Sequence, residues 1–298
     1  MGARTDLKVG FACNNRCVFC AQGEKRGTTR AVPFDELVEH LRRTYQPGTG
    51  LVLTGGEPTV RRDLARLVAS ARSLGYRPIQ VQTNGRMLMY RDLVARLCAA
   101  GVTEFSPALH GPTAEIHDAL TRAPGSFEQT TRGIANAVAS GANVVTNTVV
   151  ARENLGYLVA TVEKLHALGC RHQQLALVHP VGTAADLFER VVPRIGEAAR
   201  AIAEAVRAGR ALGVEVVVEA VPPCLLRGVE DAVVEERIPF TTVVDIDGQA
   251  FAFSDWRREE GKAKGPPCES CARRESCEGP WREYPQHHGW DEYVPYAS

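Results

Sequence analysis

The chain has 298 residues, a formal net charge of +0 and 44% hydrophobic residues. This length can bury one large core plus a small appendage, and the neutral charge balance argues against a nucleic-acid partner. No apolar run is long enough to span a bilayer and no charged-then-apolar leader is present, so we expect a cytoplasmic protein without a membrane partner. Nine cysteines in a reducing compartment suggest metal ligation rather than disulfides.

The first two hundred residues alternate between short apolar strands and amphipathic helices. The predicted strands cover residues 7–12, 51–54, 78–83, 104–109, 143–150 and 174–178. The predicted helices cover residues 34–45, 61–74, 91–100, 127–140 and 155–168, followed by an Ala-rich helix at 193–212 and a last strand at 214–219. Regular alternation of this kind predicts an α/β fold with a parallel sheet and right-handed crossovers.

Three cysteines, Cys13, Cys17 and Cys20, follow the first predicted strand within eight residues. Their thiolates can bind three irons of a four-iron cluster, which leaves one iron with an open coordination position. A structural zinc knuckle is the alternative, but zinc usually takes four ligands and the sequence offers no further His or Cys nearby. The loop therefore favours a reactive iron–sulfur cluster.

A second motif, Gly55-Gly56-Glu57-Pro58, follows the second predicted strand. Two glycines let the backbone approach a ligand closely, and the carboxylate of Glu57 can meet an ammonium group. Taken alone, this motif favours an ordinary strand-to-helix turn. The C-x3-C-x2-C loop and this motif, on consecutive strands and in this order, together resemble the radical S-adenosylmethionine (SAM) superfamily.

The resemblance implies a partial (β/α)6 TIM-like barrel over residues 1–220, with a [4Fe–4S] cluster on Cys13, Cys17 and Cys20 and SAM on its open iron. It implies that an external donor of the flavodoxin or ferredoxin type supplies an electron. SAM is then cleaved to a 5′-deoxyadenosyl radical, which abstracts a substrate hydrogen atom. The residues expected to bind SAM lie mostly at the strand ends: Phe19, Gly55, Gly56, Glu57, Pro58, Asn84, Ser106 and Asn147. His110 is either a substrate-side group or a satisfied rim histidine, which we favour.

Residues 221–298 are predicted to form a small Cys-rich extension that contains a β-hairpin, with Asp247-Gly248 as its turn. Cys268-x2-Cys271-x5-Cys277 resembles part of the SPASM and twitch extensions of radical SAM enzymes. A full SPASM extension would carry cysteines where Phe253 and Trp281 stand. The resemblance therefore implies a twitch-like extension with one auxiliary [4Fe–4S] cluster, with structural zinc as the alternative.

Cys224 has three possible roles in this extension. As the fourth cluster ligand it favours an oxidative reaction, such as dehydrogenation or cross-linking, because a fully ligated cluster can accept an electron. As a free thiol it would return a hydrogen atom, as in redox-neutral radical SAM epimerases. If the fourth iron stays open, that iron can bind substrate. We favour oxidation of a small metabolite or a ribosomal peptide; a non-catalytic protein with two structural metal sites is the remote alternative.

The remaining cysteines and the aromatic tail have simpler interpretations. Cys98 lies within a helical pattern and Cys170 lies beside a strand start, so both are expected to be small buried apolar residues. His287 and His288 belong to the aromatic tail 281–296, which can cover the barrel or pack on its flank. We favour packing on the flank.

Overall fold

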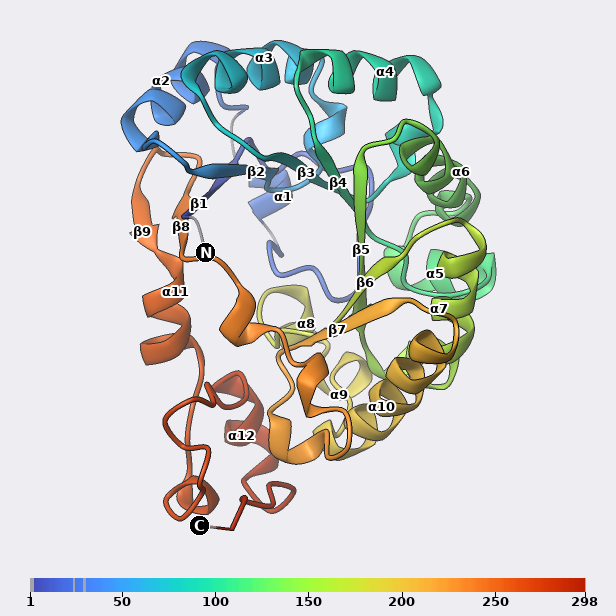
Figure 1. Cartoon of the computed structure of the whole chain (residues 1–298), viewed down its shortest axis with the longest axis vertical. Helices are drawn as coiled ribbons and strands as arrows, with labels where there is room; N and C mark the ends of the chain where they lie inside the picture. The colour runs from blue at the N-terminus through green and yellow to red at the C-terminus, as the bar shows by residue number, and fades with distance from the viewer. Residues whose placement is uncertain (1–2, 24, 29–30, 298) are drawn as a thin grey trace.

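The structure is a computed structural model that describes residues 3–23, 25–28 and 31–297. Within these residues, nine strands form one curved sheet in the order β7-β6-β5-β4-β3-β2-β1-β8-β9 (Figure 1). The strands are β1 (Arg4–Lys8), β2 (Gly50–Thr54), β3 (Ile79–Thr83), β4 (Glu104–Pro107), β5 (Asn143–Val150), β6 (His172–Leu177), β7 (Glu215–Glu219), β8 (Thr241–Val244) and β9 (Ala250–Ala252). All neighbouring strands are parallel except β8 and β9.

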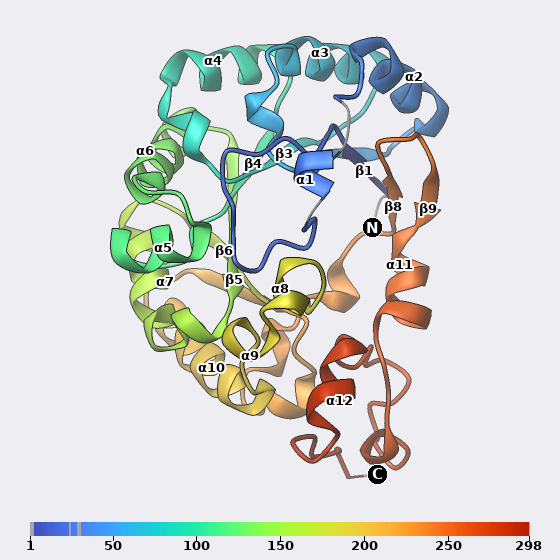
Figure 2. The same ribbon diagram turned by 180° about the vertical axis from the view of Figure 1, so that it is seen from behind.

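The helices lie mainly around the outside of the curved sheet. They are α1 (Lys25–Thr28), α2 (Phe34–Thr44), α3 (Leu64–Leu74), α4 (Arg91–Ala100), α5 (Ala114–Thr121), α6 (Ser126–Ala139), α7 (Leu158–Ala167), α8 (Thr183–Asp186), α9 (Phe188–Val191), α10 (Ile195–Ala211), α11 (Phe253–Trp256) and α12 (Glu283–His288). In Figure 1, α2, α3 and α4 lie above the sheet and α6, α7 and α10 follow its right-hand side. The short helices α8 and α9 lie in the lower middle of the molecule, below α1, as the view from behind in Figure 2 shows.

Alternate strand residues face opposite sides of the sheet, and the two sides differ in chemistry. Leu7 in β1, Leu53 in β2 and Phe105 in β4 are 0% exposed and belong to the core beneath the outer helices. On the concave side, Asp6 and Gln82 line a cavity instead of packing into an apolar core. Because polar strand residues are costly to bury without partners, the concave side is suited to hold a polar ligand.

The predicted fold class is confirmed, with small differences at element boundaries. The first strand runs from Arg4 to Lys8 and the chain turns away at Gly10, whose φ of +139° suits glycine. The predicted helix at 61–74 begins at Leu64, after a short 3-10 helix at Pro58–Val60. Helices α1, α5, α8, α9, α11 and α12 were not predicted, because short helices carry too few periodic residues to be recognised.

The predicted hairpin is present, but its first strand also extends the barrel sheet. β8 pairs with β1 in parallel, and β9 pairs with β8 around a turn in which Gly248 has φ +81°. Farther along the tail, Trp281 and Tyr284 are 7% and 1% exposed and share a hydrophobic core with residues of β6, β7 and α10. The extension therefore shares its packing with the barrel, and a division of the chain at residue 220 stays a prediction.

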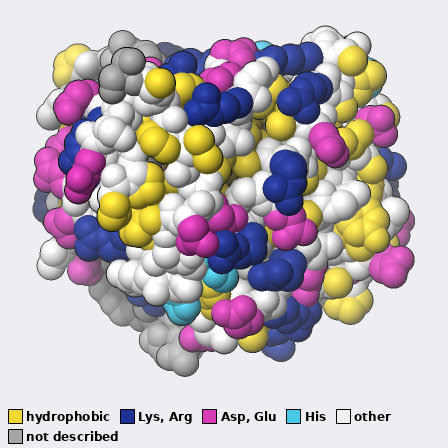
Figure 3. Space-filling view, turned by 90° about the horizontal axis from the view of Figure 1, so that it is seen from below, with side chains coloured by type: hydrophobic (Ala, Val, Ile, Leu, Met, Phe, Trp, Pro, Cys, Tyr) yellow, Lys and Arg dark blue, Asp and Glu magenta, His cyan; other side chains and the backbone are white. Residues whose placement is uncertain are grey.

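The surface carries charges of both signs. In Figure 3, which views the molecule from below, Lys and Arg side chains are interspersed with Asp and Glu side chains. Over the described ranges, no helix is both long enough and apolar enough to cross a membrane.

Candidate active site

A cavity with about 1290 Å³ of empty volume lies at the carboxyl ends of the strands. Its walls include the three loop cysteines, Cys13, Cys17 and Cys20. Five of the residues predicted to bind SAM also line it: Phe19, Gly55, Gly56, Asn84 and Asn147. Ser106 lines an adjoining cavity on the concave side of the sheet, and Asn147 borders both spaces. The Oδ1 atom of Asn147 is buried without a hydrogen-bond partner among the described residues, so it can accept a bond from a ligand.

The loop that carries the cysteines is held at both ends by backbone hydrogen bonds. The N–H groups of Arg16 and Val18 each donate to a carbonyl at the end of α5 over 2.9 Å. On the other side, the N–H of Thr183 at the start of α8 donates to the Cys20 carbonyl over 3.0 Å. A Cβ atom on Gly182 would lie 2.6 Å from the same carbonyl oxygen, so only glycine permits this approach. α5 and α8 therefore position the cysteine loop.

Gly55 and Gly56 bring the end of β2 against the start of this loop. The N–H of Gly56 donates to the Gly10 carbonyl and the N–H of Glu57 donates to the Ala12 carbonyl, both over 2.8 Å. Gly55 has φ +126°, and a Cβ there would overlap the Gly10 carbonyl oxygen. A Cβ on Gly56 would lie 2.5 Å from the Ala12 carbonyl oxygen. Both glycines are thus required by the contact between two loops, and they leave their backbone facing the cavity.

The expected role of Glu57 needs correction, because its carboxylate points into the protein. Glu57 is 2% exposed, and its Oε1 accepts hydrogen bonds from the Thr59 N–H at 2.9 Å, the Thr59 hydroxyl and the Thr83 hydroxyl at 2.6 Å. Its Oε2 accepts from the Asn84 N–H over 2.6 Å. Burial raises the pKa of Glu57, and these hydrogen bonds oppose that rise. Glu57 therefore ties the end of β3 to the 3-10 helix that Pro58 begins, and its carboxylate is already occupied by protein donors.

Two arginines that the sequence did not single out hold the loop backbone between the cysteines. The Arg86 guanidinium donates to the Asn14 carbonyl and, over 2.9 Å, to the side chain of Asn15. Arg26 donates to the Asn15 carbonyl over 2.7 Å. The Asn84 amide donates to the Asn14 side chain over 2.6 Å. Arg86 closely follows the end of β3. In the sequence, this position after a strand was the only indication that Arg86 could contact the cysteine loop.

Burial disfavours the thiolate form of two of the loop cysteines, Cys13 and Cys17. Burial raises the pKa of Cys17 to about 12, and the neighbouring thiols of Cys13 and Cys20 add to the rise. Burial also raises the pKa of Cys13, against which Arg26 acts. Binding of a metal cluster therefore displaces protons from this loop, and the nearby guanidinium groups offset the negative charge of the thiolates.

Phe19 and His110 form part of one wall of the cavity, and His117 is buried against His110. Phe19 meets His110 edge to face with ring centroids 4.7 Å apart, and His110 stacks on His117 at 5.5 Å. The Nδ1 atom of His110 accepts a hydrogen bond from the Val149 N–H over 3.2 Å. Burial lowers the pKa of His110 well below its usual value, so the ring is neutral. This geometry favours the interpretation of His110 as a satisfied rim histidine.

The C-terminal tail supplies another part of the wall. The ring of Trp281 stacks on His179 with centroids 3.8 Å apart, and the Nζ of Lys262 lies 4.1 Å from the Trp281 ring centroid. Lys262 is 3% exposed, its Nζ lies 3.7 Å from Glu235, and burial lowers its pKa. Trp281 and His179 both line the cavity that contains the cysteine loop. The tail therefore contributes directly to the candidate active site.

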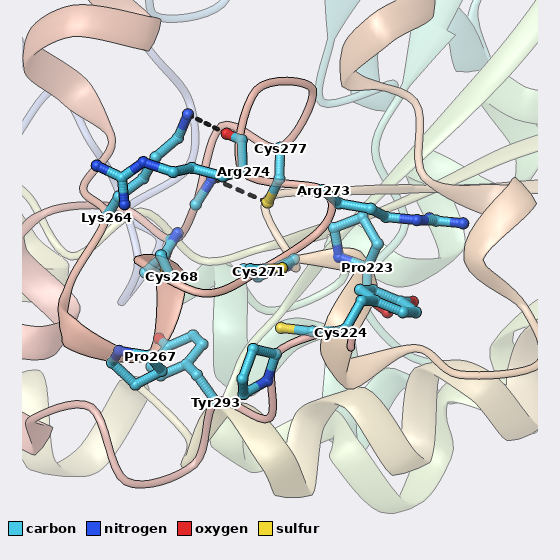
Figure 4. Close-up of a pocket in the computed structure, with 15 residues that line it drawn as sticks. Pro223, Cys224, Lys264, Pro267, Cys268, Cys271, Arg273, Arg274, Cys277 and Tyr293 are labelled. Carbon is cyan, nitrogen blue, oxygen red and sulfur yellow. Dashed lines mark hydrogen bonds between the residues drawn. The ribbon is translucent and has the colours of Figure 1, made fainter. Parts of the chain in front are cut away.

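The four cysteines of the extension line a separate cavity with about 450 Å³ of empty volume. Cys224, from the 3-10 helix Pro223–Leu225, points toward the space bordered by Cys268, Cys271 and Cys277 (Figure 4). Burial raises the pKa of Cys224 to about 11, and the other three thiols add to the rise. In the described part of the molecule, no three His, Cys, Asp or Glu side chains form a ready site for a single metal ion.

The remaining cysteines pack in or against the core, and the tail histidines contact a ring of α9. Cys170 is 1% exposed in the hydrophobic core and Cys98 packs against the same core. His287 stacks on Phe188 with ring centroids 3.8 Å apart, and His288 lies at 5.3 Å from the same ring. These contacts agree with the predicted packing of the tail on the barrel.

Comparison with known proteins decides the family. The sequence model of the radical SAM superfamily matches residues 7–165, which is more than half of the chain. The chain belongs to the radical SAM superfamily. The cysteine loop, the glycine pair and the unpartnered Asn147 oxygen fit the cluster and SAM that radical SAM enzymes bind, because they provide three thiolates and free polar groups around one cavity.

Several relatives share this barrel. An AdoMet-dependent heme synthase of Oleidesulfovibrio alaskensis is 35% identical over 190 residues, which cover 62% of this chain and 48% of that protein. A probable GTP 3′,8-cyclase of Saccharolobus islandicus is 32% identical over 189 residues, covering 62% and 60%. The match thus spans about half to three-fifths of the length of these relatives.

Solved structures extend the similarity of fold to the tail. The structure of Streptococcus suis SuiB bound to the precursor peptide SuiA has a TM-score of 0.68 and 13% identity, covering 98% of this chain and 74% of that chain. The coproporphyrinogen III oxidase HemN of Escherichia coli, a radical SAM enzyme, has a TM-score of 0.55 and 17% identity, covering 71% and 53%. At these identities the similarity shows the fold alone.

Proposed function

We propose that this radical SAM enzyme carries a second [4Fe–4S] cluster in its extension and catalyses an oxidative transformation of its substrate, such as a dehydrogenation or a cross-link. One observation carries the proposal: Cys224 lines the same cavity as Cys268, Cys271 and Cys277. Four thiolates around one space can ligate a four-iron cluster completely. A fully ligated cluster has no open iron and is suited to transfer electrons.

In this proposal Cys13, Cys17 and Cys20 hold the SAM-binding cluster. Phe19, the Gly55–Gly56 backbone, Asn84 and Asn147 line the same cavity and bind SAM. When bound, the first cluster would pass an electron from the external donor to SAM, and the second cluster would accept the electron that the substrate loses. The chain orients the substrate between these groups and excludes water.

The proposed substrate is a small metabolite or a ribosomal peptide. The heme synthase and GTP cyclase relatives support the first class by name, and SuiB bound to its precursor peptide supports the second. The polar concave side of the sheet suits either one. We also propose a flavodoxin- or ferredoxin-type electron donor, as other members of the superfamily require a reduced cluster.

The redox-neutral alternative needs Cys224 as a hydrogen-atom donor to the substrate. Such a thiol would have to reach the cavity that contains the cysteine loop. Cys224 instead lines the separate cavity of the extension, here called the tail cavity, with Cys268, Cys271 and Cys277. The tail residue that lines the cavity of the cysteine loop is Trp281. This arrangement supports Cys224 as a ligand rather than as a hydrogen donor.

Iron and sulfide content after anaerobic reconstitution tests the proposal. We expect about eight irons per wild-type chain, with matching sulfide. Cys224→Ala should lower the iron content or alter the spectrum of the second cluster, whereas Cys98→Ala, a cysteine outside both cavities, should change neither. Cys13→Ala should abolish formation of 5′-deoxyadenosine. About four irons plus one zinc in the wild type would contradict the proposal. A Cys224→Ala variant that keeps both clusters and loses only hydrogen return to substrate would favour the epimerase.

A further inference from the structure

The hydroxyl group of Tyr293 is buried at the cysteine-lined tail cavity without a protein partner. Tyr293 is 6% exposed, and its hydroxyl has no hydrogen-bond partner within the residues that the structure describes. The side chain lines the tail cavity together with the four cysteines, and Figure 4 shows it on the side of Cys224 and Cys268. A buried hydroxyl without a partner is unfavourable, so an occupant of this cavity is its natural partner.

Two other tyrosines of the tail show that hydroxyl groups here are otherwise satisfied. Tyr296, which lines the same cavity, donates to the Pro223 carbonyl over 2.9 Å. The Tyr284 hydroxyl donates to Glu292 over 2.5 Å and accepts from the Ile195 N–H over 2.7 Å. Tyr293 differs from both, because its hydroxyl has no hydrogen-bond partner among the described residues, and its side chain lines the cavity of the four cysteines.

A tyrosine hydroxyl carries its proton at neutral pH, because its ordinary pKa is about 10. The ring of Tyr293 packs on Trp290 with centroids 5.3 Å apart, which limits its movement. Tyr293 is therefore a fixed hydrogen-bond donor beside the thiol groups. An anionic cluster with sulfur acceptors is the kind of occupant that such a donor suits.

We infer that the Tyr293 hydroxyl donates a hydrogen bond to a sulfur atom of the second cluster and thereby raises its reduction potential. The inference rests on the proposed second cluster. A hydrogen bond to a cluster sulfur stabilises the reduced form more, because that form carries more negative charge. Tyr293 is a positioning residue for electron transfer and does not ligate iron.

Redox titration followed by electron paramagnetic resonance tests this role without a substrate. The background is the full chain with Cys13, Cys17 and Cys20 replaced by alanine, so that the second cluster gives the only iron signal. In this background Tyr293→Phe should lower the equilibrium constant for cluster reduction about tenfold, which is about 59 mV for a one-electron couple. Tyr296→Phe is the matched control, since its hydroxyl already has a protein acceptor, and it should leave the potential unchanged.

The outcomes separate this inference from the proposal on which it rests. A full iron content with an unchanged potential in Tyr293→Phe would overturn the role of Tyr293 and leave the second cluster intact. A background protein that binds no iron would overturn both. If Tyr293→Phe fails to fold, electron–nuclear double resonance on the unsubstituted tail cluster in D2O decides the question. An exchangeable deuteron coupled to the reduced cluster supports the hydrogen bond, and the absence of any such coupling refutes it.

Discussion

Gly56→Ala should separate the glycine loop from the cysteine loop, on the side of the cavity where we propose that SAM binds. The added Cβ would lie 2.5 Å from the carbonyl oxygens of Phe11 and Ala12, where ordinary contacts begin at 3.4 Å. Both atoms belong to the backbone, so neither can move aside by a change of rotamer. The cysteine loop, in which Cys13 follows Ala12, must therefore shift as a unit.

The structure allows an estimate of the cost. Overpacking of a tight contact costs about 1–3 kcal/mol. The shift also weakens the hydrogen bonds from Gly56 to Gly10 and from Glu57 to Ala12, now 2.8 Å each, and each bond contributes about 0.5–1.5 kcal/mol. We expect a total loss of about 2–6 kcal/mol in the free energy of unfolding. A displacement of Cys13 by about 1 Å would further slow SAM cleavage by about 100-fold.

The assay combines urea denaturation with 5′-deoxyadenosine yield after reconstitution. Gly156→Ala is the matched control, because a Cβ there meets nothing within 4 Å and its backbone carries no positive φ. We expect the control to retain the stability and the yield of the wild type. A Gly56→Ala variant with unchanged stability and unchanged yield would refute the conclusion that close backbone contact requires this glycine.

Three further substitutions test other parts of the structure. In Glu57→Gln, the amide N–H2 must face a hydrogen-bond donor, either the Asn84 N–H or the threonine donors. Urea denaturation should therefore show a loss of about 1–3 kcal/mol in the free energy of unfolding. An unchanged stability would contradict the hydrogen bonds assigned to Glu57. Burial lowers the pKa of His117 to about 4, so the unfolded chain binds a proton at this residue at a higher pH than the folded protein does. The stability that the neutral ring contributes is complete above pH 6.5. It is lost as the pH falls toward 4, by up to about 1.4 kcal/mol per pH unit. His117→Asn should reduce the slope in unfolding measurements between pH 7 and 4.5 without removing it, because the pKa of His110 is also lowered by burial. An equal slope in both proteins would exclude a contribution from His117. Arg257→Met should lower the unfolding free energy by about 1–3 kcal/mol, because Glu278 loses two bonds of 2.8 Å and keeps its 3.3 Å contact with Arg258. An unchanged stability would show that Arg258 compensates fully for the loss.

The sequence predicted the fold class and the location of the cysteines because both depend on local patterns. Alternating apolar and polar segments indicate parallel strands and crossover helices, and residues after such strands must gather at one edge. Asn84 and Asn147 are therefore brought to the same cavity as Cys13, although they lie far apart along the chain. The direction of a side chain at the rim is not local information. Glu57 points inward because Thr83 and Asn84, on the next strand, offer it donors.

The contacts between the tail and the barrel could not be predicted from sequence patterns. Nothing near Thr241–Val244 indicates that this strand pairs with β1, since a hairpin strand has the same pattern whether or not it joins a larger sheet. From the sequence, Trp281 was predicted to belong to an aromatic tail that packs on the flank of the barrel. It lines the active-site cavity because His179, which follows β6, offers a ring on which it stacks.

The short segment from Cys277 to Trp281 connects the two cavities. Cys277 and Gly279 line the space between the tail cysteines, and Trp281 lines the space around the cysteine loop. The Nζ of Lys262 lies 4.1 Å from the centroid of the Trp281 ring and is buried with Glu235 as its ion-pair partner. A change in the tail that moves Cys277 must therefore also move part of the active-site wall. This coupling explains why the extension shares a hydrophobic core with the barrel, since a loosely attached tail could not hold Trp281 against His179.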